Sequence, residues 1–103
     1  MDGMELIAFE IISNVGMAKS LAIEALRAVR AGDYEEGDKK LEEASEYLVK
    51  GHHAHTSLIQ KEASGEDLAF SVTLMHGQDH LMTTILLQDL MKHMIELYKR
   101  GTN

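Results

Sequence analysis

The chain contains no proline in its 103 residues, and this absence limits the possible folds more than any other feature of the sequence. Proline interrupts helices because it lacks a backbone N–H and its ring clashes with the preceding turn. Alanine, leucine, methionine, glutamate and lysine, which favour helices, are abundant throughout the chain. We therefore expect an all-α fold built from long helices.

Two glycine-containing segments divide this helical sequence. Gly32 is suited to the left-handed position that ends a helix, and Asp33 followed by Glu36 matches the cap that starts the next helix. The segment 64–67, Ser-Gly-Glu-Asp, repeats this pattern. The sequence therefore predicts three helices, over residues 4–31, 34–63 and 67–100.

Short connections between these helices predict an up-down-up three-helix bundle, in a single domain that covers residues 1–103. The first helix has an apolar stripe that should face the core, formed by Ile7, Ile11, Val15, Ala18, Ala22, Ala25 and Val29. The second helix begins a similar stripe with Leu41, Ala44 and Leu48.

The third predicted helix is apolar on more than one face. One stripe contains Val72, Met75, Met82 and Leu86, and another contains Leu74, Leu81 and Ile85. Three helices cannot easily bury both stripes. We therefore expect self-association, and a cyclic homotrimer would present the first stripe of each subunit to a common axis.

Charge and composition argue against several function classes. The net charge of -7 repels nucleic acid and anionic lipid surfaces. No uninterrupted apolar run is long enough to cross a bilayer, and there is no signal pattern, so we expect no direct membrane insertion. The absence of cysteine fits a reducing compartment, and we expect a cytoplasmic protein.

A carboxylate interrupts the first apolar stripe of the third helix. Asp79 falls in register with Met75 and Met82, at the spacing of a helix–helix seam. One interpretation is a buried polar residue that sets the register of association. The other is a metal ligand, because three converging carboxylates would bind a hard cation such as Mg²⁺.

Two histidines flank this position. His76 and His80 are one helical turn apart and therefore share one side of the helix. They are either ordinary surface or core histidines, or a site at which a neutral imidazole accepts a phosphoryl group as a phosphohistidine. His52 and His55 on the second helix continue its core stripe, either as a polar end of the core or as donors that orient His76.

A glycine also lies inside the third predicted helix, where it is unfavourable relative to alanine by about 1 kcal/mol. Gly77 follows His76 directly. It leaves room either for a partner or phosphate beside that histidine or for tight packing of another helix.

The segment 75–84, Met-His-Gly-Gln-Asp-His-Leu-Met-Thr-Thr, resembles the lactose/cellobiose-type IIA components of the bacterial sugar phosphotransferase system, the lactose/N,N'-diacetylchitobiose family. Segments 9–12, 62–66 and 96–101 are similar to that family as well, so the resemblance extends over nearly the whole chain.

This resemblance implies a homotrimer in which the histidine matching His76 accepts a phosphoryl group from HPr. The group then passes to a cysteine of the IIB component during uptake of a lactose- or cellobiose-type sugar. The aspartate matching Asp79 would hold a Mg²⁺ ion shared by three subunits. The candidate supporting residues are His80, His52, His55 and Gln78.

One departure affects the choice of sugar. Lactose-type members have glutamine where this chain has His55. Lactose, cellobiose, chitobiose and other β-glucosides therefore all stay open as the transported sugar.

Three alternatives compete with this hypothesis. A zinc hydrolase would use His76 and His80 with a third ligand from His52 or His55. A histidine phosphotransfer domain would accept its phosphoryl group from a receiver aspartate. A plain oligomerisation module would use the apolar stripe alone.

Overall fold

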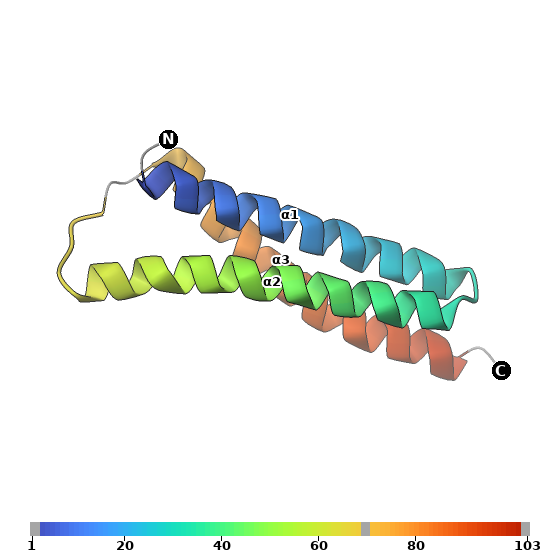
Figure 1. Ribbon diagram of the computed structural model, residues 1–103. Helices are drawn as coiled ribbons and strands as arrows, with labels where there is room; N and C mark the ends of the chain where they lie inside the picture. Colours follow the sequence, from blue (N-terminus) through green and yellow to red (C-terminus); the bar gives the residue numbers. More distant parts are fainter. Residues whose placement is uncertain (1–2, 69–70, 102–103) are drawn as a thin grey trace.

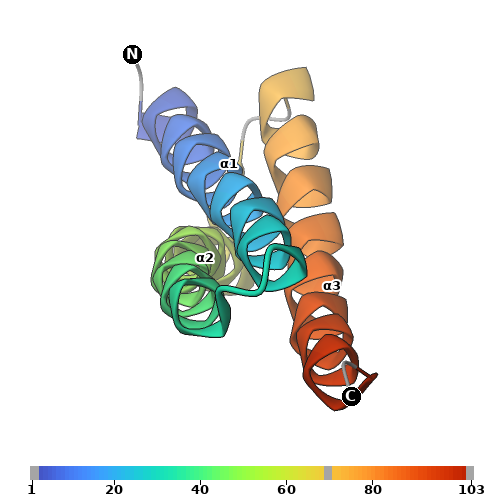
Figure 2. The ribbon, with the colours of Figure 1, turned by 90° about the vertical axis from the view of Figure 1, so that its right-hand side faces the viewer.

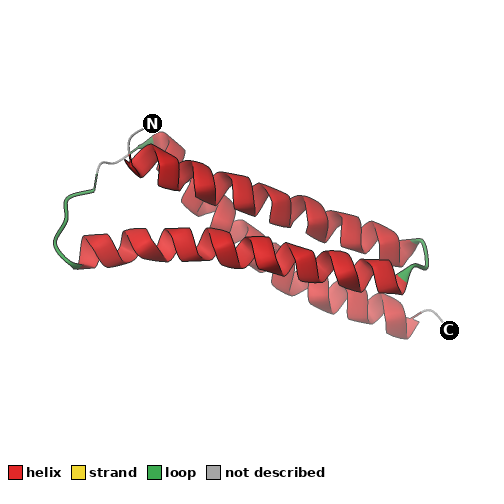
Figure 3. Ribbon diagram, in the orientation of Figure 1, coloured by secondary structure: helices red, strands yellow, loops and turns green. Residues whose placement is uncertain are grey.

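The computed structural model describes residues 3–68 and 71–101, and these residues form three long helices without any strand (Figure 1, Figure 3). The helices are α1 (Gly3–Arg30), α2 (Tyr34–Ala63) and α3 (Val72–Gly101). They run up, down and up in an elongated bundle of 56 × 23 × 19 Å. The prediction of an all-α, three-helix architecture is confirmed.

The turn between α1 and α2 forms as the sequence predicts. Gly32 adopts a left-handed φ of 90°, and the N–H of Asp33 donates to the carbonyl of Ala28 at 2.9 Å. The Asp33 Oδ1 atom accepts a hydrogen bond from the N–H of Glu36 at 3.1 Å. This side-chain acceptor satisfies a backbone donor that has no partner inside the first turn of α2.

The predicted start of the third helix at Asp67 is wrong. Residues 66–68 are not helical, and α3 begins at Val72. The Ser71 Oγ atom accepts from the N–H of Leu74 at 3.0 Å and therefore supplies the N-terminal cap. Leu74, whose N–H this cap satisfies, lies on the buried face of α3.

Helix α1 contacts both other helices along most of its length (Figure 2). Its buried residues are Ala8, Ile11, Val15, Ala18, Leu21, Ala22, Ala25 and Val29. This set confirms the predicted core stripe, except that Ile7 is only partly buried against it. On α2, Ala44 is buried, while Leu41 and Leu48 pack against the core from its edge.

Helix α1 is also the one helix of the described ranges that is long and apolar enough to cross a membrane by length and composition. No such segment was expected from the sequence. Eight α1 residues are buried within the bundle, and 33% of the apolar window is buried.

Helix α3 has one buried face and one exposed apolar face. Leu81 is fully buried and Leu74 nearly so, in contact with α1 and α2. The opposite face carries half-exposed or more exposed apolar side chains, which we name the α3 stripe: Val72, Met75, Met82, Leu86, Leu90 and Leu97. The predicted division of this helix into two apolar faces is therefore confirmed.

The glycines of the bundle meet their neighbours at different distances. A Cβ atom added at Gly77 would lie 3.4 Å from Ile12 Cγ1 and 3.5 Å from Ile11 Cγ2, which are ordinary van der Waals contacts. A Cβ atom at Gly51 would lie 2.8 Å from the Cγ2 atom of the fully buried Val15. Gly77 therefore faces α1, but the contact leaves room for a Cβ atom, so tight packing does not require glycine at this position.

We predict opposite effects for alanine at these two positions. Gly77→Ala should leave the free energy of unfolding unchanged or raise it by up to about 1 kcal/mol, because alanine favours the helix. Gly51→Ala should lower it by about 1–3 kcal/mol through overpacking against Val15. Urea unfolding followed by circular dichroism, at one fixed protein concentration, measures both. Equal destabilisation of the two variants would show that the close contact with Val15 does not distinguish the two glycines.

Candidate functional site

The two histidines of the sequence motif stack on each other near the start of α3. The rings of His76 and His80 have centroids 6.0 Å apart and an angle of 9° between their planes. His76 is exposed, whereas His80 is partly buried. The predicted placement of both rings on one side of the helix is what the structure shows, and the His76 ring is accessible from solvent.

This pair lies on the flank of α3 that faces α1. Burial lowers the pKa of His80, the positive charges of Lys19 and His76 lower it further, and the Asp79 carboxylate opposes them. Lys19 belongs to α1, so its charge acts on the His80 ring across the contact between the two helices. The neighbouring Gly77 packs directly on α1 in the same region.

Asp79 occupies a different side of α3. It is exposed and lies in register with the α3 stripe, between Met75 and Met82. A carboxylate in the middle of an exposed apolar stripe has no partner on its own helix that would explain its position. Its carboxylate chemistry fits a hard divalent cation if several copies converge.

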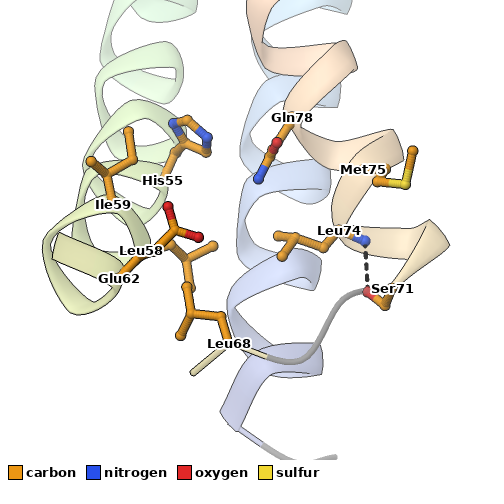
Figure 4. A pocket seen from close by; sticks show the side chains of 9 residues that line it. All are labelled: His55, Leu58, Ile59, Glu62, Leu68, Ser71, Leu74, Met75 and Gln78. Atoms are coloured by element: carbon orange, nitrogen blue, oxygen red, sulfur yellow. Dashed lines mark hydrogen bonds between the residues drawn. The ribbon is translucent and has the colours of Figure 1, made fainter. Parts of the chain in front are cut away.

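A cavity of about 360 Å³ opens between the end of α2 and the start of α3 (Figure 4). Its polar residues are His55, Glu62, Ser71 and Gln78, and its apolar lining comes from Leu58, Ile59, Leu68, Leu74 and Met75. His55 and Gln78 lie on opposite walls of this cavity. Burial lowers the pKa of His55, and the nearby His52 lowers it further.

The structure separates the cavity from the histidine pair. Residues two apart on a helix differ in direction by about 200°, so His76 and Gln78 point to nearly opposite sides of α3. His55 faces Gln78, and His52 lines a second groove between α2 and α3. Both therefore lie toward α3, as expected, but neither is brought to His76 within one subunit.

The zinc alternative is not supported by this arrangement. Among residues 3–68 and 71–101 of the single chain, no three histidine, cysteine or acidic side chains group closely enough to hold a metal ion. The stacked His76 and His80 therefore lack the third ligand that zinc would need. A site that takes one Asp79 from each of three chains would not be visible in a single chain.

Sequence reasoning did not identify Lys19 as part of this region. No motif marks it, and its effect on the pKa of His80 depends on how α1 and α3 pack. The sequence does predict that the first and third helices run parallel, and this was the available signal that residues of the first helix act on residues of the third.

Comparison with known proteins identifies the family. Residues 6–99 match the family described as "PTS system, Lactose/Cellobiose specific IIA subunit". The chain belongs to this family. The IIA components of this family are proteins of the phosphotransferase system and of sugar transport. The resemblance recognised from the segment around His76 is thus confirmed.

Individual relatives agree with this assignment. The lactose-specific EIIA component of Streptococcus mutans is 57% identical over 97 residues, which cover 94% of this chain and 93% of that protein. The cellobiose-specific enzyme IIA of Bacillus anthracis superposes with a TM-score of 0.93 at 43% identity, covering 97% of this chain and 92% of that one.

A third relative was solved together with a partner protein. It is the IIA(Chitobiose) protein of the N,N'-diacetylchitobiose branch of the Escherichia coli phosphotransferase system, in complex with HPr. It superposes with a TM-score of 0.83 at 29% identity and covers 100% of both chains. The relatives thus carry three different sugar names on one three-helix fold.

The partly buried His55 should titrate abnormally. We predict that NMR of its ring gives a midpoint below the ordinary pKa of 6.5, because burial disfavours the charged form. The unfolded chain then binds this proton more readily than the folded chain. The contribution of His55 to stability is therefore complete above pH 6.5 and is lost as the pH falls through the lowered value.

The variant His55→Gln provides the control for this titration. It should flatten the pH dependence of the unfolding free energy below pH 6.5. A midpoint for His55 at or above 6.5 would contradict the burial seen in the cavity wall.

Proposed function

We propose that this chain is a phosphocarrier, which accepts a phosphoryl group from HPr on His76 and passes it to a cysteine of the IIB component. The transported sugar would be of the lactose or cellobiose type. The main support is the exposed His76 ring, held in a stack with His80 on a regular helix. Family membership and the HPr complex of the chitobiose relative support the same donor.

The chemistry requires two displacements at phosphorus. In the first, the lone pair of a neutral His76 ring nitrogen, Nε2 in this proposal, forms the N–P bond. The bond between phosphorus and the donor atom breaks, and its electron pair stays on the donor. In the second, a cysteine sulfur of IIB forms the S–P bond, and the N–P pair returns to the imidazole. The acceptor thiol comes from the partner, because this chain contains no cysteine.

The protein contributes positioning more than covalent chemistry to such a transfer. In this proposal the stack with His80 would limit rotation of the His76 ring and help to orient the attacking nitrogen. His80 is thus the best supported of the four supporting candidates. His52, His55 and Gln78 could reach the phosphoryl group only from a neighbouring subunit, since they lie on another side of α3.

The α3 stripe supports a homotrimer. Its exposed apolar side chains extend from Val72 to Leu97 over nearly the whole helix. Contiguous apolar surface of this length usually marks an interface. Threefold association would place the three α3 stripes against one another and bury this surface.

Such a trimer would bring three Asp79 carboxylates together. Their mutual repulsion would be strong without a counter-ion, and Mg²⁺ accepts carboxylate oxygens as ligands. We therefore propose Asp79 as the metal ligand, with one carboxylate from each subunit. The ion would neutralise charge at the interface and would not take part in phosphoryl transfer.

We also propose a cytoplasmic location, where a HPr-type donor and a IIB component can meet the protein in turn. The net charge of -7 argues against nucleic acid as a further partner.

The phosphocarrier proposal predicts one phosphoryl group on one histidine. After incubation with phosphoenolpyruvate, enzyme I and HPr, intact mass measured without acid should show one added phosphoryl group on the wild type. His76→Ala should show none. The matched control is His93→Ala, an exposed histidine later on α3, which should be phosphorylated like the wild type. Absence of the added group from the wild type would refute the proposal.

The trimer and metal proposals predict different effects for Asp79→Leu. The trimer should persist or tighten, because leucine continues the apolar stripe and removes repelling charges. Bound Mg²⁺ should disappear. Light scattering gives the oligomeric mass, and elemental analysis of the dialysed protein gives the metal content. A monomeric Asp79→Leu variant would show instead that the ion is required for assembly, and a monomeric wild type would refute the trimer.

A further inference from the structure

A second polar side chain interrupts the α3 stripe. His93 is exposed and lies three residues after Leu90 and four residues before Leu97. Residues at these spacings are neighbours on the surface of a helix. Leu90 and Leu97 are themselves half-exposed or more exposed. His93 therefore lies among exposed apolar side chains, as Asp79 does nearer the start of α3.

His93 and Asp79 point in similar directions from α3. They are separated by 14 positions, which bring the helix to within about 40° of four full turns and about 21 Å further along its axis. The proposed trimer places the α3 stripes of three parallel subunits around one axis. It would therefore bring three His93 rings together as well, about 21 Å from the Asp79 carboxylates.

Three converging imidazole rings favour a different ion from three carboxylates. A neutral imidazole offers one nitrogen lone pair and no negative charge, which suits Zn²⁺ and similar transition-metal ions better than Mg²⁺. Three histidines also leave a fourth tetrahedral position for water. Within residues 3–68 and 71–101 of one chain, no three histidine, cysteine or acidic side chains could hold a metal ion. A site at His93 would thus be complete only in the assembly.

A carboxylate is available to orient each of these rings. Asp89 lies four residues before His93, and Glu96 lies three residues after it, so both are on neighbouring turns of the same face. A histidine that binds a metal usually donates its other ring N–H to such a group. The Glu96 Oε1 atom is already paired with the Nη2 atom of Arg100 at 2.7 Å. Asp89 is therefore the better acceptor.

We propose that three His93 side chains, one from each subunit, form a binding site for a divalent transition-metal ion such as Zn²⁺. This inference rests on the proposed homotrimer and adds a site with nitrogen ligands to the site with oxygen ligands at Asp79. The ion holds the C-terminal halves of the three α3 helices together. It lies more than four turns of α3 from His76 and takes no part in phosphoryl transfer.

The test uses Co²⁺ as a spectroscopic substitute for Zn²⁺ on the full-length protein, after a chelator has removed bound metal. Tetrahedral Co²⁺ lacks a centre of symmetry and absorbs visible light strongly, whereas octahedral Co²⁺ with oxygen ligands absorbs weakly. The variant His93→Gln removes the ligand and keeps a polar side chain. The matched control is His53→Gln, which removes an exposed histidine of α2. Circular dichroism and light scattering report folding and assembly.

We expect strong absorption that saturates at one Co²⁺ per three wild-type chains. An equimolar amount of Zn²⁺ should displace the Co²⁺, and an excess of Mg²⁺ should leave the absorption unchanged. His93→Gln should lose the absorption, and His53→Gln should keep it. His93→Gln should still accept a phosphoryl group on His76 as the wild type does.

The outcomes separate this inference from the function beneath it. A trimeric wild type without strong absorption, or absorption that persists in His93→Gln, would overturn the inference and leave the phosphocarrier and the trimer in place. Saturation at one Co²⁺ per chain would also contradict a shared site, and this result does not depend on how the variant folds. A monomeric wild type would overturn the trimer and this inference together, whereas phosphorylation of His76 is measured independently.

Discussion

The close packing of α1 against both other helices determines where every candidate functional group lies. Ala18, Ala22 and Ala25 have no exposed surface, and Gly51 and Gly77 contact α1 from the other two helices. Small side chains on both sides of these contacts let the helix axes approach closely. The face of α3 that α1 occupies is thereby fixed. The positions of all other α3 residues around the helix follow from its period of 3.6 residues.

That period divides α3 into sectors with separate tasks. Leu81 points into the core, His80 lies at the edge of the α1 contact, and Asp79 lies on the exposed stripe. These are three consecutive residues, each about 100° from the next. One short segment can therefore contribute to folding, to the proposed phosphoryl transfer and to the proposed assembly without placing two tasks on one face. Because neighbouring residues of a helix point in different directions, residues with different proposed roles can lie close together in the sequence around His76.

The sequence predicts what depends on local pattern and does not predict what depends on tertiary contact. The cap at Asp33, the faces of α3 and the pairing of His76 with His80 are local properties, and all were predicted. The predicted start of α3 was wrong because the segment 64–67 resembles a cap, whereas Ser71 supplies the cap that forms. The effect of Lys19 on the pKa of His80 and the facing of His55 and Gln78 depend on side chains of different helices, which no spacing within one helix reveals.

The electrostatics of the proposed carrier distinguish a permanent charge from a transient one. The proposed Asp79 site would persist through the whole cycle, so its compensation could be a bound ion that stays in place. In the proposed cycle the phosphoryl group would be on His76 for only part of the time, and a tightly bound cation would remain unpaired for the rest. The exposed position of His76 avoids this cost, because solvent screens the phosphoryl charge when it is present. Weak compensation also leaves the N–P bond reactive, which a carrier needs if it is to pass the group onward.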